Sequence, residues 1–280
     1  MIIVLKKADF SQLNIGKVDF TTELTEETKV LMARATKYPI VKENRYAQAL
    51  NKLVSAMVEK GIYDKVTTLV IPSMSNSIAE CSFNQRTGQA NSNPSYFTTL
   101  YGLREDGSLF KTETVFSDEG THCGHTISHT YNNMCIFGFY KSGGTGIDNI
   151  ISAKINGWYG SSNYLKFIAS GPAGQIGAAG SIALSSNKNP LSDRSMPTSA
   201  FVVNYTANGI TYQDKGIAVE ASYQTLSKTA ELIRLYPLIE GASSKASDGG
   251  LFIYGCGEGL TNEESSQMFT ILNEFGNTFL

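Results

Sequence analysis

The last thirty residues of this 280-residue chain constrain its fold more than any other segment. Residues 251–256 form a strand-like apolar run, and the glycines at 257 and 259 end it. Thr261, with Glu264 three residues later, is a capping box that satisfies free N–H groups at a helix start. Apolar residues then recur at helical spacing: Met268, Ile271, Leu272 and Phe275. The sequence therefore predicts a closing strand and an amphipathic helix that packs on a folded body.

Composition and turn signals indicate a mainly β fold. The chain has 26 glycines, 7 prolines, 10% aromatic residues and 17% charged residues, which favours short strands and many turns over a helical bundle. Strand-like runs recur at residues 67–72, 79–84, 134–140, 164–168, 199–205, 210–213 and 217–220. Asn208 and Gly209 are typical of a tight hairpin turn, and residues 214–216 begin another turn. Successive hairpins predict an antiparallel β-sandwich rather than alternating strands and helices.

Two helices are predicted in the first sixty residues. Residues 25–35 begin with a capping threonine and two acids, and Pro39 stops this helix. Residues 44–60 form a second helix that ends at Gly61. Its apolar face consists of Ala47, Leu50, Leu53, Val54, Met57 and Val58. This face must be buried, either on the chain's own sandwich or against copies of the chain, so residues 1–62 are predicted as a helical arm and residues 63–280 as the sandwich.

Charge and hydropathy argue against nucleic acid and membrane as partners. A net charge of −2 and an isoelectric point near 6.0 leave no dense basic stripe for phosphates. The amino terminus has only a very short apolar run before its lysines, so no export signal is expected. The uncharged stretch between Lys166 and Lys188 contains Pro172 and several glycines, which excludes a membrane helix. Its glycine-rich part, residues 171–180, is predicted as a flexible loop, because three Gly-x-x triplets are too few for a collagen-like helix.

The cysteines are too scattered for a disulfide scaffold. They stand at Cys81, Cys123, Cys135 and Cys256. Cys81 and Cys256 alternate with apolar neighbours, as small buried side chains do. Free thiols in a reducing cytosol are therefore expected.

Three segments together resemble a known family. Residues 61–66, Gly-Ile-Tyr-Asp-Lys-Val, follow a helix and precede a strand, and a run from Ala79 ends in Asn84. With the closing strand, glycine turn and capped helix, this pattern resembles the concanavalin A-like (laminin G-type) lectin domains in virion proteins of tailed bacteriophages, the crAss-like group among them. The resemblance spans about residues 61–280, with gaps in the middle. It implies a β-sandwich jelly roll in a fibre or decoration subunit of the phage head or tail.

The resemblance also implies location and partners. Such a protein is made in the bacterial host cytoplasm without a signal peptide and ends in the virion. In phage proteins an N-terminal segment of this kind often attaches the display domain to the particle or to sister subunits. The expected partners are copies of the chain in a trimer or dimer, capsid or tail subunits, and host-surface glycans, where many copies give avidity.

The three histidines lie within eight residues, at His122, His125 and His129. With Cys123 inside the run and Cys135 nearby, the donor types suit a zinc or iron site. A strand would place His125 and His129 about 13 Å apart, too far for one metal, given a rise of about 3.3 Å per residue. In a trimer, one histidine from each chain could meet on the axis. The simpler interpretation is a surface or packed histidine-rich loop, and no cofactor is expected.

A candidate carbohydrate-binding segment surrounds the single tryptophan. Trp158, Tyr159 and Tyr164 are aromatic residues among glycine, serine and Asn163. Exposed aromatic rings stack on sugar rings, and nearby amides bind their hydroxyl groups. The alternative is that these aromatic residues belong to the core, where large aromatics usually lie.

No catalytic motif is found, so the chain is predicted not to be an enzyme. A glycoside hydrolase on this fold would need two carboxylates about 5 to 9 Å apart, but the acids cluster at turns and helix starts, as at Glu105 and Asp106. The alternative function is a carbohydrate-binding module or glycoside hydrolase of a gut bacterium. A purely structural interaction domain that binds no sugar is the third possibility.

Overall fold

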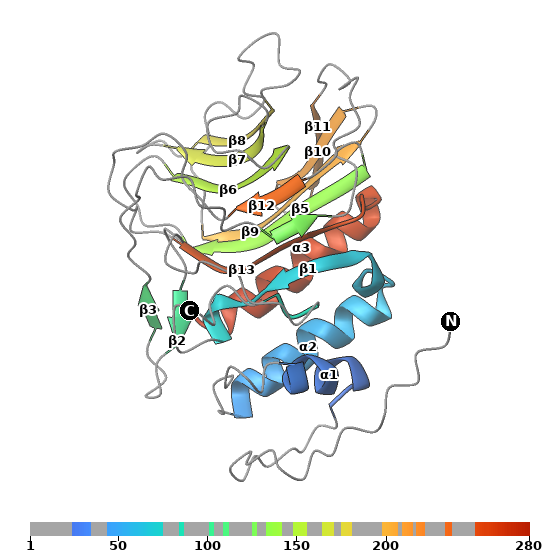
Figure 1. Ribbon diagram of the computed structural model, residues 1–280, viewed down its shortest axis with the longest axis vertical. Coiled ribbons are helices and arrows are strands. Elements are labelled where there is room, and N and C mark those ends of the chain that lie inside the picture. The colour runs from blue at the N-terminus through green and yellow to red at the C-terminus, as the bar shows by residue number, and fades with distance from the viewer. Residues whose placement is uncertain are drawn as a thin grey trace.

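The computed structural model describes residues 24–34, 44–74, 84–86, 101–103, 109–111, 125–127, 133–141, 148–155, 164–170, 175–180, 198–206, 209–214, 217–221, 233–236 and 250–280. Within them the chain is mainly β, with two large antiparallel sheets and a few helices (Figure 1). The helices are α1 (Glu26–Arg34), α2 (Asn44–Glu59) and α3 (Asn262–Asn277), with short 3₁₀ turns η3 (Tyr63–Lys65) and η4 (Pro72–Met74). The predicted antiparallel β class is confirmed.

The larger sheet has six described strands, all paired antiparallel. Their order is β1 (Val66–Val70), β13 (Gly250–Gly257), β5 (Asn133–Lys141), β9 (Ser199–Thr206), β10 (Gly209–Asp214) and β11 (Ile217–Ala221). The second sheet runs β4 (His125–Ile127), β12 (Ile233–Tyr236), β6 (Asp148–Ile155), β7 (Tyr164–Ser170) and β8 (Gln175–Gly180). A small sheet pairs β2 (Tyr101–Leu103) with β3 (Leu109–Lys111). In Figure 1 the five-stranded sheet lies on one side of the six-stranded sheet, and α2 and α3 lie on the other.

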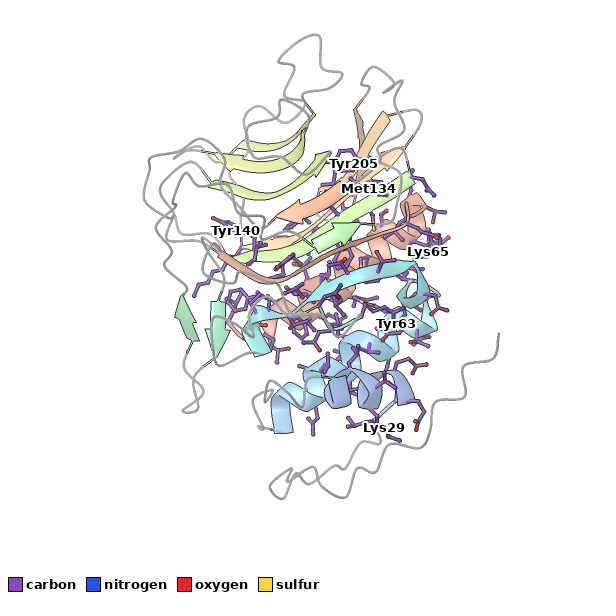
Figure 2. All side chains as sticks on the ribbon, viewed as in Figure 1. Lys29, Tyr63, Lys65, Met134, Tyr140 and Tyr205 are labelled. Atoms are coloured by element: carbon purple, nitrogen blue, oxygen red, sulfur yellow. The ribbon has the colours of Figure 1, made fainter. Side chains whose placement is uncertain are left out.

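The six-stranded sheet is buried on both faces. Its helix side carries Cys135, Phe137, Phe139, Ala200, Val202 and Phe252, all in one apolar cluster with α2 and α3. Its other side carries Met134, Ile136, Tyr140, Phe201, Val203, Tyr205 and Tyr254, which are also buried (Figure 2). For this reason β5 is apolar at nearly every position instead of alternating, as strands covered on both faces are.

Helix α3 forms as predicted and is fixed to the sheet by both apolar and polar contacts. The Thr261 hydroxyl accepts a hydrogen bond from the Glu264 N–H at 3.2 Å, and the Glu264 carboxylate accepts one from the Thr261 N–H at 2.8 Å, which confirms the capping box. The predicted apolar face is buried. Buried Asn204 of β9 donates to the Ser265 hydroxyl and accepts from the Leu260 N–H at 3.0 Å. Similarly, Asn273 accepts from the Ala200 N–H at 2.9 Å.

Helices α1 and α2 confirm the N-terminal prediction, with one exception. Gly61 adopts a φ of 68°, and hydrogen bonds from Gly61 N–H to Val58 O and from Ile62 N–H to Met57 O end α2 in a Schellman motif. Val58, predicted on the apolar face, is instead 39% exposed, because the buried face of α2 turns away from it.

The apolar face of α2 is buried by the chain itself. Leu50, Leu53, Val54 and Met57 belong to the same apolar cluster as α3 and the six-stranded sheet. Of the two ways to cover this face, the structure uses the chain's own sandwich. The functional division at residue 62 stays a prediction, while the hydrophobic core is continuous across it.

Two turn predictions need correction, and one strand prediction lies mostly outside the described residues. Gly209 pairs with Thr206 and is therefore already in β10, whereas residues 207 and 208 lie outside the described residues. The glycine-rich run at 171–180 is not simply a loop, because its second half is β8, paired along its length with β7. Small residues suit a strand whose neighbours approach closely. Of the predicted strand at 79–84, only Asn84 is described, and it forms a bridge with Val70.

Replacing Gly276 with alanine should destabilise the fold. A Cβ at this position would meet the ring of Phe139, because α3 lies directly against β5 there. Overpacking costs about 1–3 kcal/mol, whereas the better helix propensity of alanine would by itself add up to about 1 kcal/mol. We expect urea denaturation to show a net loss for Gly276→Ala. The loss should shrink in a Phe139→Leu background, and the exposed neighbour Asn277→Ala should change little. A stabilised Gly276→Ala would contradict this close contact.

Candidate functional site

The register of the five-stranded sheet places chemistry-bearing residues in transverse rows. Thr126 pairs with Arg234, Arg234 with Lys154, and Lys154 with Tyr164, which makes one row across four strands. Two residues along, Tyr236 pairs with Ser152, Ser152 with Lys166, and Lys166 with Ala179, which makes a second row. Residues directly opposite on antiparallel strands share a face, and so do residues two apart on one strand. We call these eight positions the two-row patch.

The intervening positions form a contrasting apolar set. Most are apolar: Ile127, Ile151, Ala153, Ile155, Leu165, Phe167, Ala169, Ile176, Ala178, Ile233 and Leu235, with His125 and Asp148 as the polar exceptions. The opposite face has one large apolar residue beyond the second row, Ile168. A sheet with one apolar and one polar face is typical of packing on a core on one side and facing water on the other. The six-stranded sheet lies beside this sheet (Figure 1) and offers the core. By register, the two-row patch and the apolar set occupy opposite faces of this sheet.

The two-row patch concentrates positive charge. Arg234 and Lys154 stand directly opposite each other, where Cβ atoms lie about 5 Å apart. Lys166 is a diagonal neighbour of Lys154, at about 7–8 Å. The five strands contain one acidic residue, Asp148. It pairs with Ala169 of the apolar set and stands six residues from Lys154, about 20 Å along the strand at about 3.3 Å per residue. No acid of these strands therefore balances the three cations.

One of the four predicted sugar-binding residues, Tyr164, belongs to this patch. Tyr164 begins β7 and closes the first row. Trp158, Tyr159 and Asn163 lie outside the described residues, in the segment 156–163 that joins the ends of β6 and β7. The chain connection therefore starts and ends beside Lys154 and Tyr164.

The predicted histidine cluster is only partly described. His125 begins β4 and pairs with Leu235, so the register assigns it to the apolar set. His122 and His129 lie outside the described residues. Among the residues that are described, no three His, Cys, Asp or Glu side chains are grouped closely enough to hold a metal ion. The metal site and the surface or packed histidine-rich segment therefore both stay predictions.

Sequence reasoning missed the three cations of the patch. A signal was present, because residues 152–155, 164–167 and 233–236 each alternate polar and apolar residues. Alternation shows which residues share a face of one strand, but it cannot show that Arg234 stands opposite Lys154. That pairing joins positions eighty residues apart and depends on the folded sheet.

Residues 63–65 make contacts that join distant parts of the fold. The Arg86 guanidinium lies 3.9 Å from the centre of the Tyr63 ring, and its Nε donates to Val66 O at 2.8 Å. Lys65 donates to both carboxylate oxygens of Glu264, at 2.6 and 2.8 Å, and so joins the turn before β1 to the start of α3 (Figure 2). We call the Lys65–Glu264 pair the clasp. In the described part of the chain no helix is long and apolar enough to cross a membrane.

Acid should weaken the clasp. Burial opposes ionisation of Glu264, but the hydrogen bond from Lys65 and the Thr261 N–H outweigh it and hold the pKa of this carboxyl below its usual value. A carboxyl with a lowered folded-state pKa stabilises the fold above its unfolded pKa, about 4.3, and the contribution is lost as the pH falls through the folded pKa. We expect Glu264→Gln to lower the free energy of unfolding by about 1–2 kcal/mol at pH 7, since both side chains are partly exposed.

The difference between wild type and Glu264→Gln should shrink when denaturation is repeated below about pH 4. Glu263→Gln is the matched control, because the Glu263 carboxylate accepts only from the Gln267 amide on the exposed face. A difference that stays constant down to pH 3 would show that the charge of Glu264 does not matter.

The two described cysteines are buried, free and unsuited to chemistry. Burial raises the pKa of the Cys256 thiol to about 12, although the Thr68 and Thr67 side chains favour the thiolate. Burial, followed by the nearby Cys256, also raises the pKa of the Cys135 thiol far above its ordinary value. The thiolate, which is the reactive and metal-binding form, is therefore disfavoured at both.

Alkylation followed by peptide mass spectrometry should distinguish these thiols. With iodoacetamide at pH 8, Cys135 and Cys256 should stay unmodified in the native protein and react fully in guanidinium chloride, because unfolding removes the burial that suppresses the thiolate. A model peptide with an exposed cysteine gives the reference rate. Rapid native labelling of either residue would contradict the burial described here.

Comparisons with known proteins show distant likeness only. No family model matches the chain, and no curated protein matches it. Among solved structures, Trypanosoma rangeli sialidase in complex with sialic acid aligns at 10% identity with a TM-score of 0.47, covering 79% of this chain and 38% of the sialidase. Domain 4 of AbnA, a GH43 extracellular arabinanase from Geobacillus stearothermophilus, in complex with arabinotriose, aligns at 9% identity with a TM-score of 0.42, covering 73% of this chain and 98% of that domain. At these TM-scores the chain paths differ overall, and no activity of this chain follows from them.

Proposed function

We propose that this chain is a non-catalytic adhesive subunit that binds host-surface glycans on the outer face of its five-stranded sheet. The observation that carries the proposal is the register that brings Tyr164, Tyr236 and three long cationic side chains into the two-row patch. Aromatic rings offer stacking surfaces for sugars, and the neighbouring Ser152 and Thr126 add hydroxyl groups. The connection with Trp158 begins and ends at the same place.

The finer fold assignment is part of the proposal. A concanavalin A-like jelly roll has two stacked antiparallel sheets, and the pairing of β1 with β13 brings the first and last strands of this sandwich together in one sheet. Together with the sequence resemblance, this pairing supports the lectin-like assignment. It does not depend on the distant solved structures.

The virion is the proposed setting, and it rests on the sequence resemblance. In that setting the chain would be a fibre or decoration subunit, assembled as a homo-oligomer and attached to capsid or tail subunits. Because the apolar face of α2 is buried by the chain itself, attachment through that face is not part of the proposal. Mass spectrometry of purified phage particles tests the setting, and absence of the protein from them would refute it.

The proposal takes the role to be non-catalytic, as the sequence predicts. Hydrolysis by a pair of carboxylates needs two acids about 5–9.5 Å apart. The described strands of this sheet contain only Asp148, which stands at the far end of β6 from Tyr164. The alternative, a glycoside hydrolase of a gut bacterium, would have to draw both acids from other segments.

Binding to a glycan array should depend on two aromatic residues. Trp158→Ala and Tyr164→Ala should each weaken glycan binding about tenfold or more, since stacking and the accompanying apolar burial are lost. Trp158→Phe and Tyr164→Phe keep a ring and serve as matched controls that should retain most of the affinity. Thermal unfolding of each variant checks that the fold is intact. Full binding by both alanine variants, or no binding to any glycan by the wild type, would contradict the proposed function.

A further inference from the structure

We infer that the ligand of the two-row patch is an acidic glycan, one whose sugar units carry carboxylate or sulfate groups. This inference rests on the proposed glycan-binding function and specifies its substrate class. It begins from the opposed pair Arg234 and Lys154 on neighbouring strands. Like charges directly opposite in a sheet destabilise it. Placing two cations there, with Lys166 as a diagonal neighbour, lowers the stability of the sheet through repulsion. A bound anion would remove this repulsion.

The positive charge is a local property of the patch. The whole chain carries 23 Lys and Arg against 25 Asp and Glu, so basic residues are not in excess overall. In the five strands, by contrast, the charged residues of the two rows are all cations, and Asp148 belongs to the other face by its register. A general need for solubility would not separate the charges in this way, since it is met equally by mixed signs.

The residue types match the groups of an acidic sugar. A guanidinium group binds a carboxylate or sulfate through two parallel N–H donors, whereas an ammonium group acts as a point charge. Arg234 therefore supplies the directional contact, and Lys154 and Lys166 lie on the next two strands, β6 and β7, for a second acidic unit. Tyr164 at the end of the row supplies a ring for the sugar itself.

The size of the patch favours a short oligosaccharide over a nucleic acid. Each of its two rows crosses four strands and spans about 14 Å at about 4.8 Å per strand, and the rows lie about 7 Å apart along the strands. That area covers two or three sugar units. Nucleic-acid binding ordinarily shows a longer basic stripe and an excess of positive charge over the domain, which a chain of net charge −2 lacks.

The test measures binding of the full chain to matched pairs of glycans. Each pair consists of an acidic oligosaccharide and its neutral counterpart: oligogalacturonate with its methyl ester, which differ in the carboxylate, and a carrageenan oligosaccharide with its desulfated form, which differ in the sulfate alone. Calorimetry or a glycan array gives the affinities. We expect the acidic member of at least one pair to bind tenfold or more tightly than its partner, and the better pair distinguishes carboxylate from sulfate.

Substitutions in the two-row patch test which residues bind the acidic glycan. Arg234→Gln and Lys154→Gln should each weaken binding of the acidic member about tenfold and lower its dependence on salt, since each removes one charged contact. Arg234→Lys keeps the charge but loses the paired donors, and should bind between wild type and Arg234→Gln. Lys60→Gln is the control, because Lys60 follows α2 and pairs with Glu59 at the surface. Its affinity should stay within about twofold of wild type.

The unfolding temperature distinguishes a binding role of Arg234 from a purely structural role. If Arg234 and Lys154 repel each other, Arg234→Gln should unfold at the same or a higher temperature than wild type while binding more weakly. Loss of binding together with a clearly lower unfolding temperature in both Arg234→Gln and Arg234→Lys would overturn the inference, since the arginine would then hold the fold.

The remaining outcomes separate this inference from the proposed function. Equal binding of neutral and acidic members, unaffected by the charge variants, would overturn the acidic ligand and leave glycan binding in place. No binding to any glycan would overturn both. Tighter binding of a single-stranded oligonucleotide than of every glycan, lost in Arg234→Gln, would show that the partner is a nucleic acid and would overturn the inference.

Discussion

The docking of α3 on the six-stranded sheet is the contact on which the rest of the structure depends. Its apolar face covers β5 and β9, and the clasp between Lys65 and Glu264 fixes its first turn to the strand entry at β1. Asn204 binds the backbone just before the helix from inside the sheet. Strand β13 and helix α3 are adjacent in the chain, so one short segment supplies both a strand inside the sheet and the helix that covers it. The same helix then provides the surface on which α2 packs.

The packing of helices on one face of the six-stranded sheet explains why a second sheet is needed. With one face of the six-stranded sheet taken by helices, its other apolar face still needs a cover, and the apolar set of the five-stranded sheet is suited to provide it. Only the outer face of that second sheet is then left for polar residues. The two-row patch is therefore not an isolated surface feature. Its position follows from where the buried faces of the other layers lie.

The helices could be predicted from local sequence signals, but the pairing of strands that are distant in the chain could not. The capping box at Thr261, the glycine stop at Gly61 and the apolar face of α3 depend on residues within one or two turns of each other, so the sequence alone could identify them. The strand character of residues 175–180 depends on pairing with β7, and glycine-rich composition concealed it. The cations of the two rows could not be grouped from sequence for the same reason, because three separate strands supply one cation each. Of the predicted sugar-binding residues, Tyr164 alone has a described position, and its place in the first row came from the register.

The strand order also has a consequence for biosynthesis. Strand β13 lies between β1 and β5, yet 180 positions separate Val70 from Gly250 in the chain. At about 5–20 residues per second, a ribosome takes roughly 10–40 s to make that separation. Strand β5 is made partway through this interval, and from then on both β1 and β5 lack the strand that joins them. Until β13 has emerged, their unpaired apolar edges are open to aggregation.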